Sequence, residues 1–220
     1  MDATIYSHTQ IIGYADLQVG DEAMGHVYGT FIASNNYRTI QKIIQNFNSA
    51  VEPDYPEWAS LELSVQLSNG CFLFPFGGIQ IDDLEELPTE PKRIDIAGLD
   101  SEVIIDYFKA NPPRSFVIEP WITLDIDRKL AIEKELRTEI SLNHELANCD
   151  CSAMCASFQC DDALFAINSK GHLGARYALV HLTWFNQKEE NPKFPITTLF
   201  TSFEEFREKR MLPDKIGFEL

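Results

Sequence analysis

Residues 61–67, LELSVQL, alternate strictly between apolar and polar side chains. A period of two places successive side chains on opposite faces of a strand, so this segment predicts a half-buried β-strand rather than a helix. Asn69-Gly70 follows, a dipeptide that favours a type I′ hairpin turn. Residues 71–76, CFLFPF, are then expected to return as the partner strand, with Pro75 at an edge or at the end of pairing. The chain is therefore expected to contain antiparallel sheet.

The rest of the chain mixes further strands and helices. Asn36 is expected to cap the first helix, and Ser202 with Glu205 three residues later forms a capping box. The order of elements predicts an α+β fold of mostly antiparallel sheet or sheets, with three to four helices packed on one side. Strand patterns cover residues 9–19, 26–33, 93–98, 163–168 and 177–185, and helical patterns cover 35–47, 101–110, 125–141 and a last segment after Ser202.

A boundary between two small subdomains is expected near residue 120. Pro112, Pro113 and Pro120 cluster there, and the density of charge changes at the same point. This boundary separates an acidic N-terminal α+β part, 1–120, from a C-terminal helix–strands–helix part, 121–220. One continuous domain is the alternative, because 220 residues can bury either one large core or two small ones.

Four of the five cysteines lie close together, at positions 149, 151, 155 and 160. Structural zinc sites typically use two chelating pairs with two to four residues between partners. Here the two intervals in that range, Cys151–Cys155 and Cys155–Cys160, share Cys155, so a second separate pair is absent. The redox motif C-x-x-C is also missing. In a strand, Cys149, Cys151 and Cys155 would share one face and Cys160 the other. A buried strand that uses cysteine as a small apolar residue is therefore favoured over a metal site or a reactive thiol.

The chain has 34 acidic and 18 basic residues, a formal net charge of −16. Residues 1–125 hold 19 acidic and 6 basic residues, so most of the excess lies in the N-terminal half. This charge repels the phosphates of nucleic acids and anionic membranes, and no partner of either kind is expected. It can serve solubility alone, or it can attract a basic protein partner.

The expected location is the cytoplasm. No segment approaches the roughly 18 apolar residues of a spanning helix. The first ten residues, MDATIYSHTQ, have neither the basic nor the apolar region of a signal peptide. An odd number of cysteines also fits poorly with a secreted disulfide framework.

Familiar catalytic motifs are missing from the sequence. Residues 144–148, HELAN, lack the second histidine of H-E-x-x-H, and there is no G-x-S-x-G. Residues 20–29, GDEAMGHVYG, have glycines but place two acids where a phosphate would sit. No catalytic residue, metal or cofactor is therefore expected, and an enzyme is the less favoured class.

Residues 81–93, IDDLEELPTEPKR, suggest a functional surface. Such a charged run is most often a solvated loop. The alternative is an acidic surface with two apolar anchors, Leu84 and Leu87, which would attract and hold a basic protein. The predicted partner-binding residues are Asp82, Asp83, Glu85, Glu86 and Glu90, with the aromatic residues Tyr55 and Trp58.

Two main hypotheses for function follow. The first is a non-catalytic binding protein, most concretely an immunity or antitoxin protein that neutralises a basic, nuclease-like toxin. It requires that the Asp82–Glu90 cluster is exposed and contiguous with other acidic residues, and that there is no deep polar cleft. The second is an enzyme or small-molecule-binding protein whose pocket is lined by the C-terminal half, with at least two of four residues converging on a cleft: His172, Arg176, His181 and Trp184. An oligomeric structural protein is a third possibility.

Overall fold

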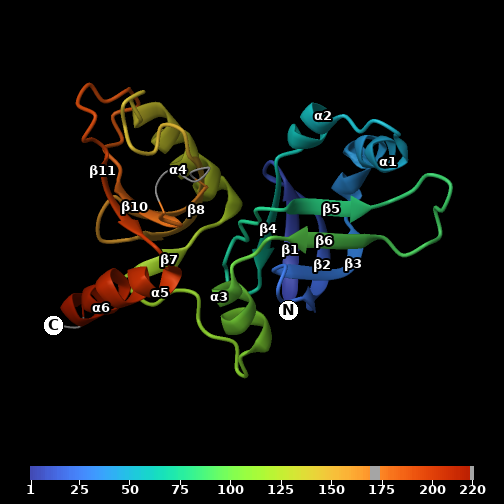
Figure 1. Cartoon of the computed structure of the whole chain (residues 1–220), viewed down its shortest axis with the longest axis horizontal. Helices are drawn as coiled ribbons and strands as arrows, with labels where there is room; N and C mark the ends of the chain where they lie inside the picture. Colours follow the sequence, from blue (N-terminus) through green and yellow to red (C-terminus); the bar gives the residue numbers. More distant parts are fainter. Residues whose placement is uncertain (169–173, 219–220) are drawn as a thin grey trace. The chain divides into compact units, whose positions relative to one another are not determined.

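The computed structural model describes residues 1–168 and 174–218, and the chain divides into two compact units, Met1–Arg114 and Ser115–Leu220. Each unit contains one antiparallel sheet, of six strands in unit 1 and five in unit 2, together with short helices (Figure 1). The predicted α+β class is therefore confirmed. The boundary at residue 120 stays a prediction about independent folding.

The sheet of unit 1 has the strand order β4-β1-β2-β3-β6-β5, with antiparallel neighbours throughout. On β3, Val27 and Phe31 lie on the buried face, and Thr30 lies on the opposite, exposed face. The strands are β1 (Asp2–Ser7), β2 (Gln10–Asp21), β3 (His26–Ala33), β4 (Leu63–Leu67), β5 (Gly78–Asp82) and β6 (Arg93–Ala97).

The hairpin predicted after residue 67 is present in a shorter form. The Leu67 N–H donates to the Cys71 carbonyl at 2.9 Å, and the Leu73 N–H donates to the Val65 carbonyl at 2.9 Å. Gly70 has a φ of 88°, whereas Asn69 keeps a negative φ, so the turn is not type I′. Instead Asn69 accepts a hydrogen bond from the Cys71 N–H through its side-chain oxygen. The returning segment forms an isolated bridge rather than a full strand.

The helices of unit 1 are short. The first is capped by Ser34 rather than by Asn36, because the Ser34 hydroxyl accepts the Asn36 N–H. Residues 52–59 contain a helix that Asp54 caps by accepting the Glu57 N–H. The elements are η1 (Asn35–Thr39), α1 (Gln41–Ser49), α2 (Tyr55–Ala59), α3 (Ser101–Val103) and the π-helical segment η2 (Ile104–Lys109).

The sheet of unit 2 has the strand order β11-β10-β9-β8-β7. Its core includes the ring of Trp121, which packs edge-on against Phe206 with the centroids 4.9 Å apart. The strands are β7 (Trp121–Thr123), β8 (Asp150–Ser157), β9 (Asp162–Asn168), β10 (Tyr177–His181) and β11 (Ile196–Phe200). The helices are α4 (Ile126–Glu139), α5 (Phe203–Phe206), the π-helical segment η3 (Arg207–Met211) and α6 (Leu212–Phe218).

The N-cap predicted at Ser202 is confirmed, since its hydroxyl accepts the Glu205 N–H at 3.0 Å. The reciprocal half of the capping box differs. The Glu205 carboxylate reaches past the cap residue and accepts the N–H and hydroxyl of Thr201, both at 2.7 Å.

The cysteine-rich segment forms the predicted strand, β8. Cys155 is fully buried in it, and all five cysteines are free thiols. The predicted assignment to faces is wrong in part, because a bulge between Ala153 and Cys155 interrupts the alternation. Cys149 precedes the strand, and Cys160 lies exposed beyond its end. No group of three metal-binding side chains is placed to hold an ion within residues 1–168 and 174–218.

None of the helices in the described part of the chain has both the length and the apolar character needed to cross a membrane.

Candidate functional site

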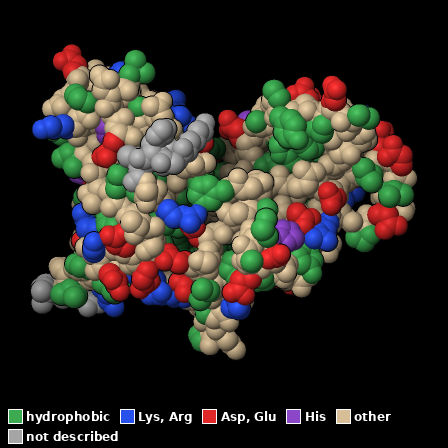
Figure 2. Space-filling model, in the orientation of Figure 1, with side chains coloured by type: hydrophobic (Ala, Val, Ile, Leu, Met, Phe, Trp, Pro, Cys, Tyr) green, Lys and Arg blue, Asp and Glu red, His purple; other side chains and the backbone are tan. Residues whose placement is uncertain are grey.

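The acidic surface predicted from the sequence is the connection between β5 and β6 in unit 1, residues 82–92, which we call the acidic loop. Asp82, Glu85, Glu86 and Glu90 are exposed, and so are Leu84 and Leu87. Figure 2 shows acidic and hydrophobic side chains intermingled at the edge of the molecule that this loop occupies in Figure 1. The loop therefore presents carboxylates and two apolar side chains on one segment.

Asp83 differs from the other acidic residues of the loop, because its side chain is only 1% exposed. The carboxylate accepts hydrogen bonds from the Tyr37 hydroxyl and the Gln41 amide, both at 2.9 Å, and from the Gln45 amide at 3.3 Å. The ammonium group of Lys92 lies 3.4 Å away. The expectation that Asp83 contacts a partner is corrected: this carboxylate lies in an internal network and anchors the base of the loop.

The pKa of Asp83 reflects two opposing effects. Burial raises the pKa. The hydrogen bonds from Gln41, Tyr37 and Gln45 and the charge of Lys92 lower it by a larger amount, so the net shift is downward. The same carboxylate and burial raise the pKa of the Tyr37 hydroxyl. Asp83 is therefore ionised and Tyr37 is neutral at neutral pH.

The rest of the loop consists of two consecutive turns. The Leu87 N–H donates to the Leu84 carbonyl, and the Glu90 N–H donates to the Leu87 carbonyl, each at 3.1 Å. Glu85 forms an ion pair with Lys42 of α1 at 2.5 Å. Glu86 and Glu90 form no ion pair with any described residue. The pKa of Asp82, at the end of β5, is raised mainly by burial and to a smaller extent by the negative charge of Asp95.

Helix α1 links the acidic loop to the two predicted aromatic residues. It supplies Lys42 and Gln45 to the loop, and on the same helix Phe47 packs against Trp58 at 4.4 Å and Tyr55 at 5.5 Å between centroids. Tyr55 is 67% exposed, whereas Trp58 is half-buried. The structure therefore brings both predicted groups against one helix, with Tyr55 more accessible than Trp58.

The structure describes three of the four residues expected to line a pocket in the C-terminal half. His172 lies outside the described residues. Arg176 lies just before β10, where its carbonyl accepts the Ile167 N–H and its own N–H donates to Phe200. Trp184 follows β10 in a left-handed backbone conformation, with a φ of 57°. None of the described members of this set lines the cavity of unit 2 described below.

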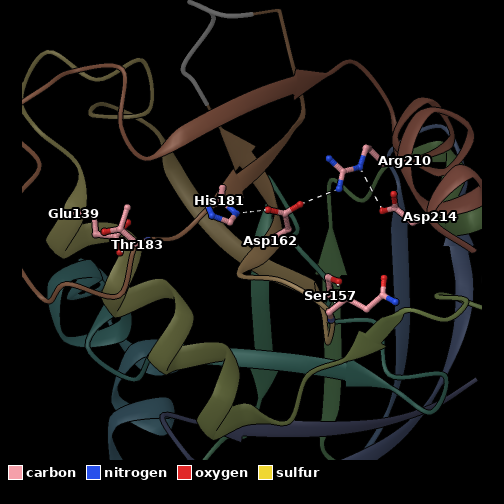
Figure 3. A network of polar contacts seen from close by, with 8 residues as sticks. Glu139, Ser157, Asp162, His181, Thr183, Arg210 and Asp214 are labelled. Atoms are coloured by element: carbon pink, nitrogen blue, oxygen red, sulfur yellow. Dashed lines mark hydrogen bonds and ion pairs between the residues drawn. The ribbon is translucent and has the colours of Figure 1, made fainter. Parts of the chain in front are cut away.

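His181 belongs to a network of polar contacts in unit 2 (Figure 3). Its Nδ1 lies 2.7 Å from Asp162, whose other oxygen accepts from Arg210 at 2.9 Å. Arg210 also donates to Asp214 at 3.3 Å, and Asp214 accepts the Trp121 indole N–H at 3.0 Å. These contacts fasten η3 and α6 to the sheet, and we assign this network a structural role.

Helix α4 contributes buried carboxylates that accept backbone N–H groups. Glu133 accepts the Ala153 N–H at 2.9 Å, beside the β8 bulge, and also pairs with Lys129. Glu139 accepts the N–H groups of Thr183 and Trp184 at 2.8 and 2.7 Å. Burial raises the pKa of Glu139, those backbone donors oppose the rise, and a hydrogen bond with Glu135 adds to it.

Unit 2 also contains a cavity of about 440 Å³, which sequence reasoning missed. It lies between the C-terminal end of α4, the segment that follows it and the start of β8, and Lys188 contributes from the β10–β11 connection. Two of the clustered cysteines, Cys149 and Cys151, line it. Burial raises the pKa of both thiols, that of Cys151 to about 12, so neither is a thiolate at neutral pH.

Comparison of the chain with known protein families, with curated proteins and with solved structures finds no match.

Proposed function

We propose that the protein binds a basic protein partner through the acidic loop of unit 1. The observation that supports this most directly is the loop itself: exposed carboxylates surround two exposed leucines on a segment whose base is held by buried Asp83. Carboxylates steer a basic surface toward the loop, and apolar side chains provide area to bury once contact forms.

The fixed base matters for affinity. Ordering a flexible loop on binding costs free energy that is subtracted from the interaction. Here Tyr37 and Gln41 hold the first residue after β5, and two internal turns shape the segment beyond it. Much of the ordering is therefore complete before a partner arrives.

The most concrete form of the proposal is an immunity or antitoxin protein acting in the cytoplasm. A nuclease holds phosphates with lysine and arginine, so a loop that displays carboxylates can occupy the same basic site and exclude the substrate. The five free thiols support a reducing location. In this form, the partner's nuclease activity falls in proportion to the complex formed.

The test compares three proteins as bait in lysate from the native source, followed by titration of the purified partner. The first is the wild type, and the second is the loop variant Asp82→Asn, Glu85→Gln, Glu86→Gln and Glu90→Gln, which leaves Asp83 intact. The third is a control with the same loss of charge at four exposed positions in unit 2: Glu145→Gln, Asp161→Asn, Glu190→Gln and Glu208→Gln.

We expect one basic protein whose affinity falls as salt rises and falls further in the loop variant. Four exposed charges at about 0.4 kcal/mol each sum to about 1.6 kcal/mol, which weakens binding about fifteenfold. The control should bind as the wild type does. Equal weakening in both variants would mean that net charge, and not the loop, determines binding, and would refute the proposed site.

A further inference from the structure

The cavity of unit 2 combines apolar walls with a group of polar side chains. Leu136 and Leu146 are both 1% exposed and form part of its wall, and Ile140 contributes beside them. The volume of about 440 Å³ falls within the range of about 300–1,000 Å³ that is typical of small-molecule sites. A small ligand with an aliphatic part would therefore fit.

Two cations lie at this cavity. Arg137 and Lys188 line the cavity, and neither forms an ion pair with a described residue. Ser141 also lines the cavity, and its hydroxyl is buried and has no hydrogen-bond partner among the described residues. A buried hydroxyl without a partner costs free energy, which a ligand that accepts its hydrogen bond would recover.

The balance of charge at the cavity is positive. Two acidic residues line it, but Glu133 is paired with Lys129 and accepts the Ala153 N–H. Asp150 is the remaining carboxylate, so Arg137 and Lys188 leave an excess of one positive charge. In a chain of net charge −16, that local excess runs against the overall composition.

We propose that this cavity binds a small monocarboxylate with a short aliphatic chain. Arg137 and Lys188 would neutralise the carboxylate, the Ser141 hydroxyl would donate to one of its oxygens, and the leucine walls would cover the aliphatic part. A monoanion suits the site better than a phosphate dianion. The excess charge is a single one, and the C-terminal end of the α4 dipole opposes additional negative charge.

This inference is independent of the proposed function. The acidic loop belongs to unit 1 and the cavity to unit 2, so either site can fail its test while the other passes.

The test uses the full chain labelled with ¹⁵N and titrated with sodium hexanoate. Hexylamine and hexanol, of the same length but cationic and neutral, serve as comparison probes. We expect hexanoate to cause saturable shifts at the amides of Arg137, Ser141 and Lys188, with weaker responses to the other two probes. Shifts of equal size with hexanol would show a merely apolar cavity, and a preference for hexylamine would reverse the proposed charge. Either result would overturn the proposal, as would the absence of saturable shifts.

A pair of double variants separates local from general charge. Arg137→Gln with Lys188→Gln should weaken hexanoate binding about tenfold or more, because charged hydrogen bonds are lost. The matched control, Lys134→Gln with Lys193→Gln, removes two exposed cations that do not line the cavity and should bind as the wild type does. Equal affinities in the two double variants would refute the assigned roles. The single variant Ser141→Ala should weaken hexanoate binding, and its amide spectrum should remain that of a folded protein.

Discussion

Replacing Asp83 tests whether the base of the acidic loop is held as the structure indicates. Asp83→Ala removes the acceptor for Tyr37, Gln41 and Gln45 and leaves Lys92 without its counter-ion. Breaking a buried ion pair from one side typically costs about 3–5 kcal/mol. The Lys92 side chain is 17% exposed and can regain some hydration, so we place the loss at the lower end, about 3 kcal/mol.

Urea unfolding followed by far-ultraviolet circular dichroism measures this loss. Asp83→Asn keeps an oxygen acceptor but removes the charge, and should cost about half as much, about 1.5 kcal/mol. Glu86→Ala, on the same loop but exposed and without an ion pair, is the control and should stay within about 0.5 kcal/mol of the wild type. A loss below about 1 kcal/mol for Asp83→Ala would refute the reasoning, because it would mean that the network does not stabilise unit 1.

The pH dependence gives a second readout of the same group. The folded-state pKa of Asp83 is below its ordinary value, so its contribution is present above the unfolded pKa of about 3.9. That contribution is lost as the pH falls through the folded-state pKa. The stability gap between the wild type and Asp83→Asn should therefore be constant near neutral pH and narrow below about pH 4.

Three further outcomes are expected. Because its pKa is raised in the folded protein, the Glu139 carboxyl stabilises the fold at low pH. That contribution is lost as the pH rises above the unfolded-state pKa of about 4.3. In Glu139→Gln, the Tm should therefore decline less between low and neutral pH. Gly25→Ala should cost about 3 kcal/mol in urea unfolding, because Gly25 has a φ of 56° and an added Cβ would lie 2.1 Å from the Leu99 carbonyl oxygen. Of the five thiols, exposed Cys160 should react first with Ellman's reagent, and buried Cys71 should react only after denaturant is added, as mass mapping of the labelled peptides would show.

Strands with a strong period of two were predictable from local pattern. The segment His26–Ala33 was predicted with the bounds of β3, and the alternation over residues 61–67 corresponds to β4. Strands β1, β5, β7 and β11 were missed. Strand β7 has only three residues, β1 also pairs with β4 far along the chain, and β5 pairs with β6 across ten intervening residues. Register at that distance is decided by tertiary packing, which a local window does not contain.

Polar residues that become buried were the least predictable. Asp83 and Glu86 look alike in a charged run, yet one lies in an internal network and the other in solvent. Similarly, Glu133 lies four residues before Arg137, a spacing that favours an ion pair along a helix, but it pairs with Lys129 and accepts a backbone N–H from β8. Arg137 therefore lines the cavity without pairing with Glu133. The choice between these partners depends on which strand packs against the helix, and no spacing within α4 indicates it.

The acidic loop is closed at its base, since the ion pair between Asp83 and Lys92 joins its two ends. The eight residues between Asp83 and Lys92 can vary in number without moving the points at which the chain leaves β5 and enters β6. The entropy of closing such a loop grows only with the logarithm of its length, so doubling it costs about 0.6 kcal/mol. Residues 84–91 can therefore lengthen, shorten or exchange their side chains while β5 and β6 keep their pairing, which makes this segment a replaceable insert on a constant scaffold.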